Sequence, residues 1–114
     1  MTQQTATEKQ GTYLPATEVL DKIVSWAQDR NLVQGATPQA QMLKMTEEVG
    51  ELAHAIARND LPKTIDAIGD CVVVLTILAA QHGIFIESCI NSAYNEIKDR
   101  KGKMVNGVFI KEVE

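Results

Sequence analysis

The sequence predicts an all-α protein, a four-helix bundle followed by a short C-terminal tail. Two observations carry this prediction: apolar residues recur at helical spacing through most of the chain, and short breaks rich in glycine, proline and asparagine separate the periodic segments. The 114 residues suit a single domain, and 45% apolar with 23% charged residues is ordinary for a globular chain. We expect a loose arm over residues 1–13, the helical domain over 14–103 and the tail over 104–114.

The first two predicted helices cover residues 17–30 and 38–58. Between them, the stretch NLVQGATP interrupts the apolar periodicity with a glycine and a proline. Thr37 and Pro38 mark the start of the second helix, because a threonine hydroxyl can cap free N–H groups and proline at the first helical position loses no hydrogen bond. The second helix is expected to run without interruption from this cap to about Arg58.

The third predicted helix covers residues 62–82 and is apolar on nearly all sides, as expected of a central helix. Its stretch 71–80 would also suit a buried strand, but the unbroken length up to Gly83 favours a helix. A fourth helix is predicted from residue 84 to about 100, with Tyr94 in its apolar stripe and therefore in the core. An Asn-Gly pair in the tail predicts a short hairpin.

Net charge and cysteine placement restrict the class of protein. A net charge of -4 without a long basic run argues against nucleic acid or an anionic membrane as the main partner. Cys71 and Cys89 lie in apolar runs without CxxC spacing, which indicates reduced, buried thiols in a cytosolic protein. The N-terminus lacks an apolar signal core and residues 71–80 are too few to span a bilayer, so we expect a cytoplasmic location. Small helical chains often complete their core through a partner subunit, which predicts a homodimer or homotetramer.

Acidic residues lie beside the apolar stripes of the two middle helices. Glu48 lies at the edge of the stripe on the second helix, Glu51 lies about one turn further along, and Glu47 points most outward. On the third helix, Asp66 and Asp70 are spaced i, i+4 and share one face. If the two helices pack as neighbours, carboxylates from both converge between them.

A partly buried group of carboxylates is strongly unfavourable unless its members are protonated or bind a cation. Oxygen ligands select a hard divalent ion, and Mg²⁺ keeps water ligands and joins phosphate oxygens. The spacing therefore predicts a Mg²⁺ that presents a phosphate-containing substrate. Two of the acids also have simpler explanations, since Glu47 suits a solvated helix face and Asp66 complements the positive end of its helix.

These residues resemble the MazG-like all-α nucleoside triphosphate pyrophosphohydrolases, particularly the small single-domain members found among phage and mobile-element proteins. The family pattern is EExxE on one helix and ExxD on the next. The stretch EEVGE supplies Glu47, Glu48 and Glu51, and Asp70 stands at the final aspartate before an apolar run. Ala67 stands where the ExxD glutamate is expected, and Asp66, one residue earlier, is the nearest acid.

The resemblance implies hydrolysis of an NTP or dNTP between the α and β phosphates, which gives the monophosphate and pyrophosphate, with Mg²⁺ as cofactor and Mn²⁺ as a substitute. It assigns Glu48, Glu51 and Asp70 to metal binding. Either Asp66 replaces the missing ExxD glutamate as a further ligand, or the metal site has one protein ligand fewer. Glu47 is either another ligand or the group that orients the attacking water, so Glu47 and Glu48 are the candidate catalytic residues. The expected role is the removal of non-standard or surplus nucleotides.

Cations near the end of the fourth helix are candidates for binding the substrate phosphates. The resemblance implies contacts from Lys98, from Arg100 or Lys101, and from Asn95 one turn earlier. The alternative is that the basic run KDRKGK complements the negative C-terminal end of the helix. Trp26 could stack on the base, although a single tryptophan on an apolar helix face also suits a core position.

Two other classes of protein compete with this interpretation. Glu51 and His54 form the Glu-x-x-His motif of di-iron carboxylate bundles, but those bundles need the motif twice and His82 follows no glutamate at that spacing. The stronger alternative is a catalytically silent helical module for oligomerisation or partner binding, which lacks the ExxD glutamate. Such a module should tolerate replacement of Glu48 or Asp70, whereas an enzyme should lose activity.

Overall fold

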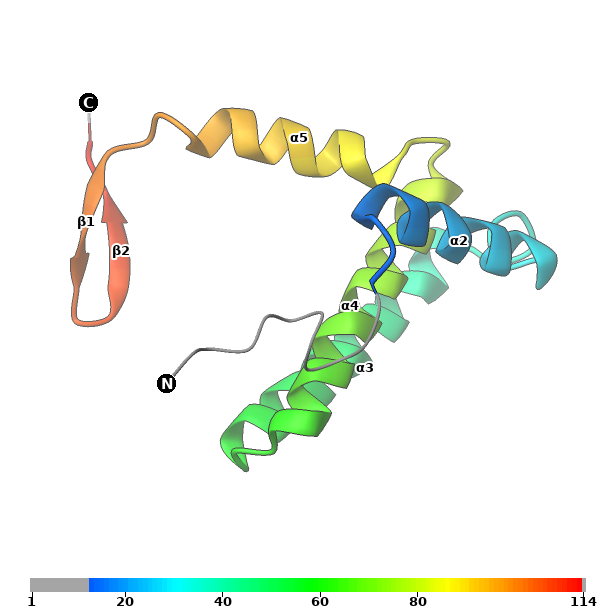
Figure 1. The fold of residues 1–114 in the computed structure, drawn as a ribbon, viewed down its shortest axis with the longest axis horizontal. Coiled ribbons are helices and arrows are strands. Elements are labelled where there is room, and N and C mark those ends of the chain that lie inside the picture. Colours follow the sequence, from blue (N-terminus) through cyan, green and yellow to red (C-terminus); the bar gives the residue numbers. More distant parts are fainter. Residues whose placement is uncertain (1–12, 114) are drawn as a thin grey trace.

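The computed structural model describes residues 13–113, which form four helices and a two-stranded hairpin (Figure 1). In chain order these are α2 (Ala16–Asp29), α3 (Pro38–Ala57), α4 (Leu61–Gln81), α5 (Ile86–Ile97), β1 (Gly102–Val105) and β2 (Val108–Lys111). The predicted all-α fold is confirmed, and each helix starts and ends within three residues of its predicted bounds. The predicted arm over residues 1–13 lies, except for Tyr13, outside the described residues.

A short turn joins α3 to α4 and sets these two helices side by side and antiparallel (Figure 1). Asn59 in this turn has a φ of 54°, a left-handed conformation that asparagine tolerates better than most residues. The Asp60 carboxylate then accepts a hydrogen bond from the N–H group of Lys63 at 3.1 Å and caps α4. Thr37 caps α3 as predicted, because its Oγ1 accepts from the N–H group of Ala40 at 3.1 Å. Both helices therefore begin at fixed points.

α4 is the central helix and contacts each of the other three described helices. Its buried side chains and smaller contributions from α2 and α3 form the core, which consists of Leu20, Ala27, Ala55, Ala67, Cys71, Val74, Ile77 and Ala79. The Gln81 amide donates to the Leu32 carbonyl at 3.0 Å and joins the end of α4 to the loop after α2. By length and composition alone α4 would also suit a membrane span, but core helices of folded domains share these properties.

α5 leaves the C-terminal end of α4 and carries the hairpin away from the other helices (Figure 1). Its apolar stripe is consequently exposed, and Tyr94 has 59% of its surface accessible. The prediction that Tyr94 lies in the core is wrong for the single chain, because none of the described helices covers this face of α5. Cys89 on α5 is exposed, against the prediction of two buried thiols, whereas Cys71 on α4 is buried as predicted.

The tail forms the hairpin that its Asn-Gly pair predicts. β1 and β2 are antiparallel, with Val105 opposite Val108. Asn106 and Gly107 between them have φ angles of 51° and 80°, and two successive left-handed residues are the signature of a type I′ turn. Every residue of both strands is exposed. The hairpin begins at Gly102, slightly before the predicted start of the tail.

Replacing Asp60 with alanine is expected to lower the free energy of unfolding by about 1 kcal/mol, because the N–H group of Lys63 loses its acceptor. Chemical denaturation followed by circular dichroism measures this change. Asp60→Asn is the matched control and should keep most of the stability, since asparagine caps helices as well as aspartate. Equal stability of the alanine and asparagine variants would show that the cap does not stabilise the turn.

Candidate metal centre

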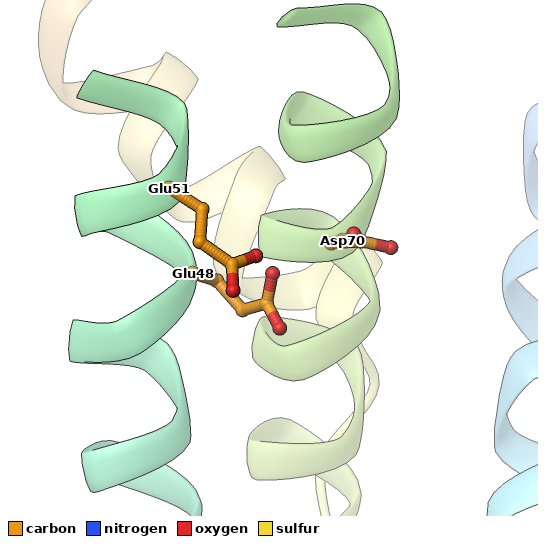
Figure 2. Close-up of side chains that lie close together, drawn as sticks. All are labelled: Glu48, Glu51 and Asp70. Atoms are coloured by element: carbon orange, nitrogen blue, oxygen red, sulfur yellow. The ribbon is translucent and has the colours of Figure 1, made fainter. Parts of the chain in front are cut away.

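Three carboxylates from α3 and α4 meet between these helices. Glu48 and Glu51 extend from α3 toward α4, where Asp70 lies (Figure 2). One oxygen of each carboxylate lies within 4.8 Å of the other two. Oxygen ligands on opposite sides of one Mg²⁺ or Ca²⁺ lie roughly 4 to 5 Å apart, given metal–oxygen distances of about 2.0 to 2.6 Å. Small side-chain rotations would therefore let a single hard cation bind all three.

Glu48 is the buried member of this group, with 6% of its surface exposed. Its Oε1 pairs with the Lys44 ammonium at 3.3 Å, whereas its Oε2 is buried and has no hydrogen-bond partner among the described residues. A buried carboxylate oxygen without a partner is strongly destabilising. A cation beside Oε2 would supply the missing interaction, so the residues present fit a divalent metal.

Repulsion and burial raise the pKa values of the two other carboxylates. The charge of Glu48, followed by burial, raises the pKa of Glu51. Burial, followed by the charges of Asp66 and Glu48, raises the pKa of Asp70. Lys44 partly opposes both shifts, and its own pKa is raised by its hydrogen bond to Glu48. A divalent cation would reverse the repulsion and compete with protons for the same oxygens.

The carboxylates border an open pocket of about 560 Å³ between α3 and α4. Its wall consists of Glu47, Gly50, Glu51, His54 and Ala55 from α3 and Lys63, Asp66, Ala67 and Asp70 from α4. The residues of each helix recur at intervals of three and four, which places them on one face. Ala67, where the family pattern expects a glutamate, offers no ligand and leaves space in the wall.

Asp66 and Glu47 lie on the pocket wall but outside the group of three converging carboxylates. Asp66 is one helical turn before Asp70 and adds to the negative charge on that residue. Glu47 points outward and lies 3.5 Å from the Lys44 ammonium. The structure thus brings three of the predicted site residues together and leaves these two beside them, and the metal and catalytic roles of all five stay predictions.

Sequence reasoning missed Lys63 on the pocket wall, and it considered His54 only as part of a di-iron motif. Lys63 lies seven residues before Asp70, two helical turns along the same face, and His54 follows Glu51 by one turn. The same periodicity that identified the acids would have placed Lys63 and His54 on the faces of these acids. It would also have found Lys44, which lies one turn before the buried glutamate that it contacts.

The four predicted substrate-binding residues do not line this pocket within the single chain. Asn95 lies near the end of α5, and Lys98 and Lys101 lie between α5 and β1. Trp26 lies on α2, and the Arg30 guanidinium stacks 4.3 Å from its ring centroid. One face of the indole therefore already has a cationic partner. The substrate roles of these residues stay predictions.

The fold and the site define a helical protein with an acidic pocket between two antiparallel helices, suited to a divalent cation. The chain belongs to the MazG nucleotide pyrophosphohydrolase domain family, whose profile matches residues 36–105. The matched range contains α3, α4, α5 and β1, and hence all three converging carboxylates. The resemblance expected from the EExxE pattern is confirmed.

A phage protein is similar to part of this chain. The "uncharacterized 18.2 kDa protein in rep-hol intergenic region" of Haemophilus phage HP1 is 48% identical over 67 residues, which covers 59% of this chain and 41% of the phage protein. The match therefore spans less than half the length of that relative. No solved structure matches the chain.

Mg²⁺ is expected to raise the thermal unfolding temperature, because an ion that binds only the folded state stabilises it, by about 2.7 kcal/mol at 100 times its Kd. In the presence of a chelator, Glu48→Gln should unfold at or above the unfolding temperature of the unsubstituted protein, because one repelling charge is removed. It should also lose most of the increase in unfolding temperature that Mg²⁺ produces. Glu18→Gln, an exposed position on α2, is the control and should keep that response. An unchanged response in Glu48→Gln would contradict the site.

Proposed function

We propose that this protein hydrolyses nucleoside triphosphates or deoxynucleoside triphosphates to the monophosphate and pyrophosphate in a Mg²⁺-dependent reaction. Two observations carry the proposal: Glu48, Glu51 and Asp70 lie close together (Figure 2), and one buried carboxylate oxygen of Glu48 has no hydrogen-bond partner among the described residues. Membership of the MazG nucleotide pyrophosphohydrolase family supports the same reaction class.

In this proposal Glu48, Glu51 and Asp70 hold the metal. A bound Mg²⁺ supplies charge neutralisation for the phosphates and acidifies water. Mn²⁺ has the same preference for oxygen ligands and is the expected substitute. Asp66, on the pocket wall one turn before Asp70, would be a further ligand. Glu47 is exposed on the pocket wall, and in this proposal it would accept a proton from the attacking water.

Lys63 is the residue that we propose for the phosphates within one chain. It shares the pocket with the carboxylates, and its exposed ammonium can reach an anion that enters from solvent. An ammonium and a divalent cation on one wall would together balance the charge of a polyphosphate. Asn95, Lys98, Lys101 and Trp26 remain proposals for substrate contacts from outside this pocket.

We propose a cytoplasmic homodimer or homotetramer that acts on surplus or non-standard nucleotides, without nucleic acid or membrane as a partner. The large exposed apolar residues on α5 support self-association. Ala67 favours a second candidate function, that of a catalytically silent helical module that lacks one catalytic acid. The buried Glu48 beside Glu51 and Asp70 supports the enzyme instead, because a binding module would be more stable without these repelling charges.

Incubation with a panel of NTPs and dNTPs plus Mg²⁺ is expected to yield monophosphate and pyrophosphate, resolved by ion-exchange chromatography. Glu48→Gln should lower kcat/KM by about 100-fold or more, because even indirect partners of a metal are worth 10- to 100-fold. Glu18→Gln should remain as active as the unsubstituted protein. Diphosphate with orthophosphate as products would contradict cleavage between the α and β phosphates, and no turnover by folded protein would favour the silent module.

Lys63→Ala is expected to raise KM about tenfold, the equivalent of losing roughly 1.4 kcal/mol of a charge-assisted contact to phosphate. Steady-state kinetics on the preferred nucleotide measure this effect. Lys63→Arg should keep KM within a few-fold, and Lys22→Ala on α2 is the control for a general loss of positive charge. A KM unchanged in Lys63→Ala would remove this residue from the substrate site.

A further inference from the structure

Lys44 contacts two acidic residues of the candidate site at once. Its ammonium lies 3.3 Å from Oε1 of Glu48 and 3.5 Å from Oε1 of Glu47. All three residues belong to α3, where Lys44 precedes Glu48 by about one helical turn. A lysine ammonium has three donors, so it can hold both carboxylates at the same time. One side chain thus links the buried candidate metal ligand to the candidate base.

The two carboxylate oxygens of Glu48 lie in different surroundings. Oε1 faces the Lys44 ammonium, whereas Oε2 is buried and has no hydrogen-bond partner in the part of the chain that the structure describes. A carboxylate can bind a cation through one oxygen or through both. Because Oε1 already has a cationic partner, Oε2 is the oxygen that remains for a metal ion. The contact with Lys44 therefore favours binding through a single oxygen.

A role in helix stability explains this contact poorly. In pairs spaced i, i+4, a glutamate that precedes its lysine stabilises a helix better than the reverse order, and here Lys44 precedes Glu48. The Lys44 side chain is 50% exposed, and exposed ion pairs contribute little to stability. The Glu48 side chain is only 8% exposed. The contact therefore matters more for the orientation of this buried carboxylate than for the stability of α3.

Lys44 lies behind the carboxylates and not on the wall of the acidic pocket. The residues that line this pocket between α3 and α4 include Glu47, Glu51 and Lys63 but not Lys44. Lys44 therefore differs from Lys63, which can meet a phosphate directly, and it acts on the site through the carboxylates that it contacts. Side chains that orient metal ligands in this way are worth roughly 10- to 100-fold in metal affinity.

We propose that Lys44 is a positioning residue of the metal centre, which holds Oε1 of Glu48 and leaves Oε2 as the oxygen that binds the ion. A ligand that is held in advance loses less conformational freedom when the ion binds. The inference rests on the metal site of the proposed function. It adds a residue that belongs neither to the family pattern nor to the group of three carboxylates.

Positioning and simple charge predict opposite effects of Lys44→Met. Methionine is also unbranched and flexible, but it has neither the positive charge nor the N–H donors. Removal of a nearby positive charge would by itself strengthen cation binding, because the ammonium and the metal ion repel each other. Loss of positioning weakens cation binding, because Glu48 is no longer held. The sign of the change therefore distinguishes a positioning residue from a counter-charge.

Binding of Mn²⁺ alone, followed by the electron paramagnetic resonance signal of the free ion, tests the proposal without nucleotide turnover. The Kd for Mn²⁺ should rise about tenfold or more in Lys44→Met. Lys44→Arg retains the charge and the donors, so its Kd should stay within a few-fold of that of the unsubstituted protein. Lys22→Met, at an exposed position on α2, is the matched control and should bind Mn²⁺ normally.

The failure of this inference and the failure of the proposed function look different in this experiment. An unchanged or lower Kd in Lys44→Met would overturn the positioning role and leave the metal site intact. A similar rise in Kd in Lys22→Met would also overturn it, because the effect would not depend on the contact with Glu48. Absence of Mn²⁺ binding to the unsubstituted protein would contradict the metal site, and with it both the proposed function and the role of Lys44.

Stability in a chelator supplies a second readout that needs no metal. If Lys44 acts through Glu48, the change in unfolding free energy caused by Lys44→Met should become smaller in the Glu48→Gln background, where the carboxylate is absent. Urea denaturation of the unsubstituted protein, the two single variants and the double variant measures this coupling, and circular dichroism shows that each of them is folded. Equal effects in both backgrounds would show that Lys44 acts independently of Glu48, which would refute the proposal.

Discussion

The antiparallel contact between α3 and α4 is the constraint on which the site depends. The turn between them is too short to allow another arrangement, and the caps at Thr37 and Asp60 fix where each helix starts. With the starts fixed, the facing residues of the two helices are also fixed, because each residue advances by 1.5 Å along the axis. The acids near the middle of α3 therefore lie opposite those in the first half of α4.

The contact between α3 and α4 brings negatively charged side chains together, which by itself destabilises the fold. Glu48 is buried beside Glu51 and Asp70, and Lys44 balances only part of their charge from an exposed position. Exposed ion pairs contribute little to stability, so the ammonium cannot offset the burial of a carboxylate. Buried charges without a full set of partners are characteristic of functional sites, where a ligand rather than the fold supplies the missing interaction.

The distribution of apolar residues supports the self-association proposed above. α4 contacts α2, α3 and α5, but several apolar residues of α4, among them Ile65 and Ile68, and most of α5 are exposed. A chain of this size buries a smaller fraction of its surface than a large domain does, and a second subunit is a common solution. The positions of Tyr94 and Cys89 follow from this, since both lie on a helix that no other described helix covers.

The sequence by itself determined the local structure and the identity of the acids. Periodicity, the Thr37 cap and the Asn106-Gly107 turn depend on neighbours in the chain, so the helices and the hairpin were predictable. Only the tertiary structure decided which side chains meet. It brought Asp70 to the two glutamates, set Asp66 beside them, added Lys63 to the pocket and left Tyr94 exposed, because these outcomes depend on how helices pack and not on spacing within one helix.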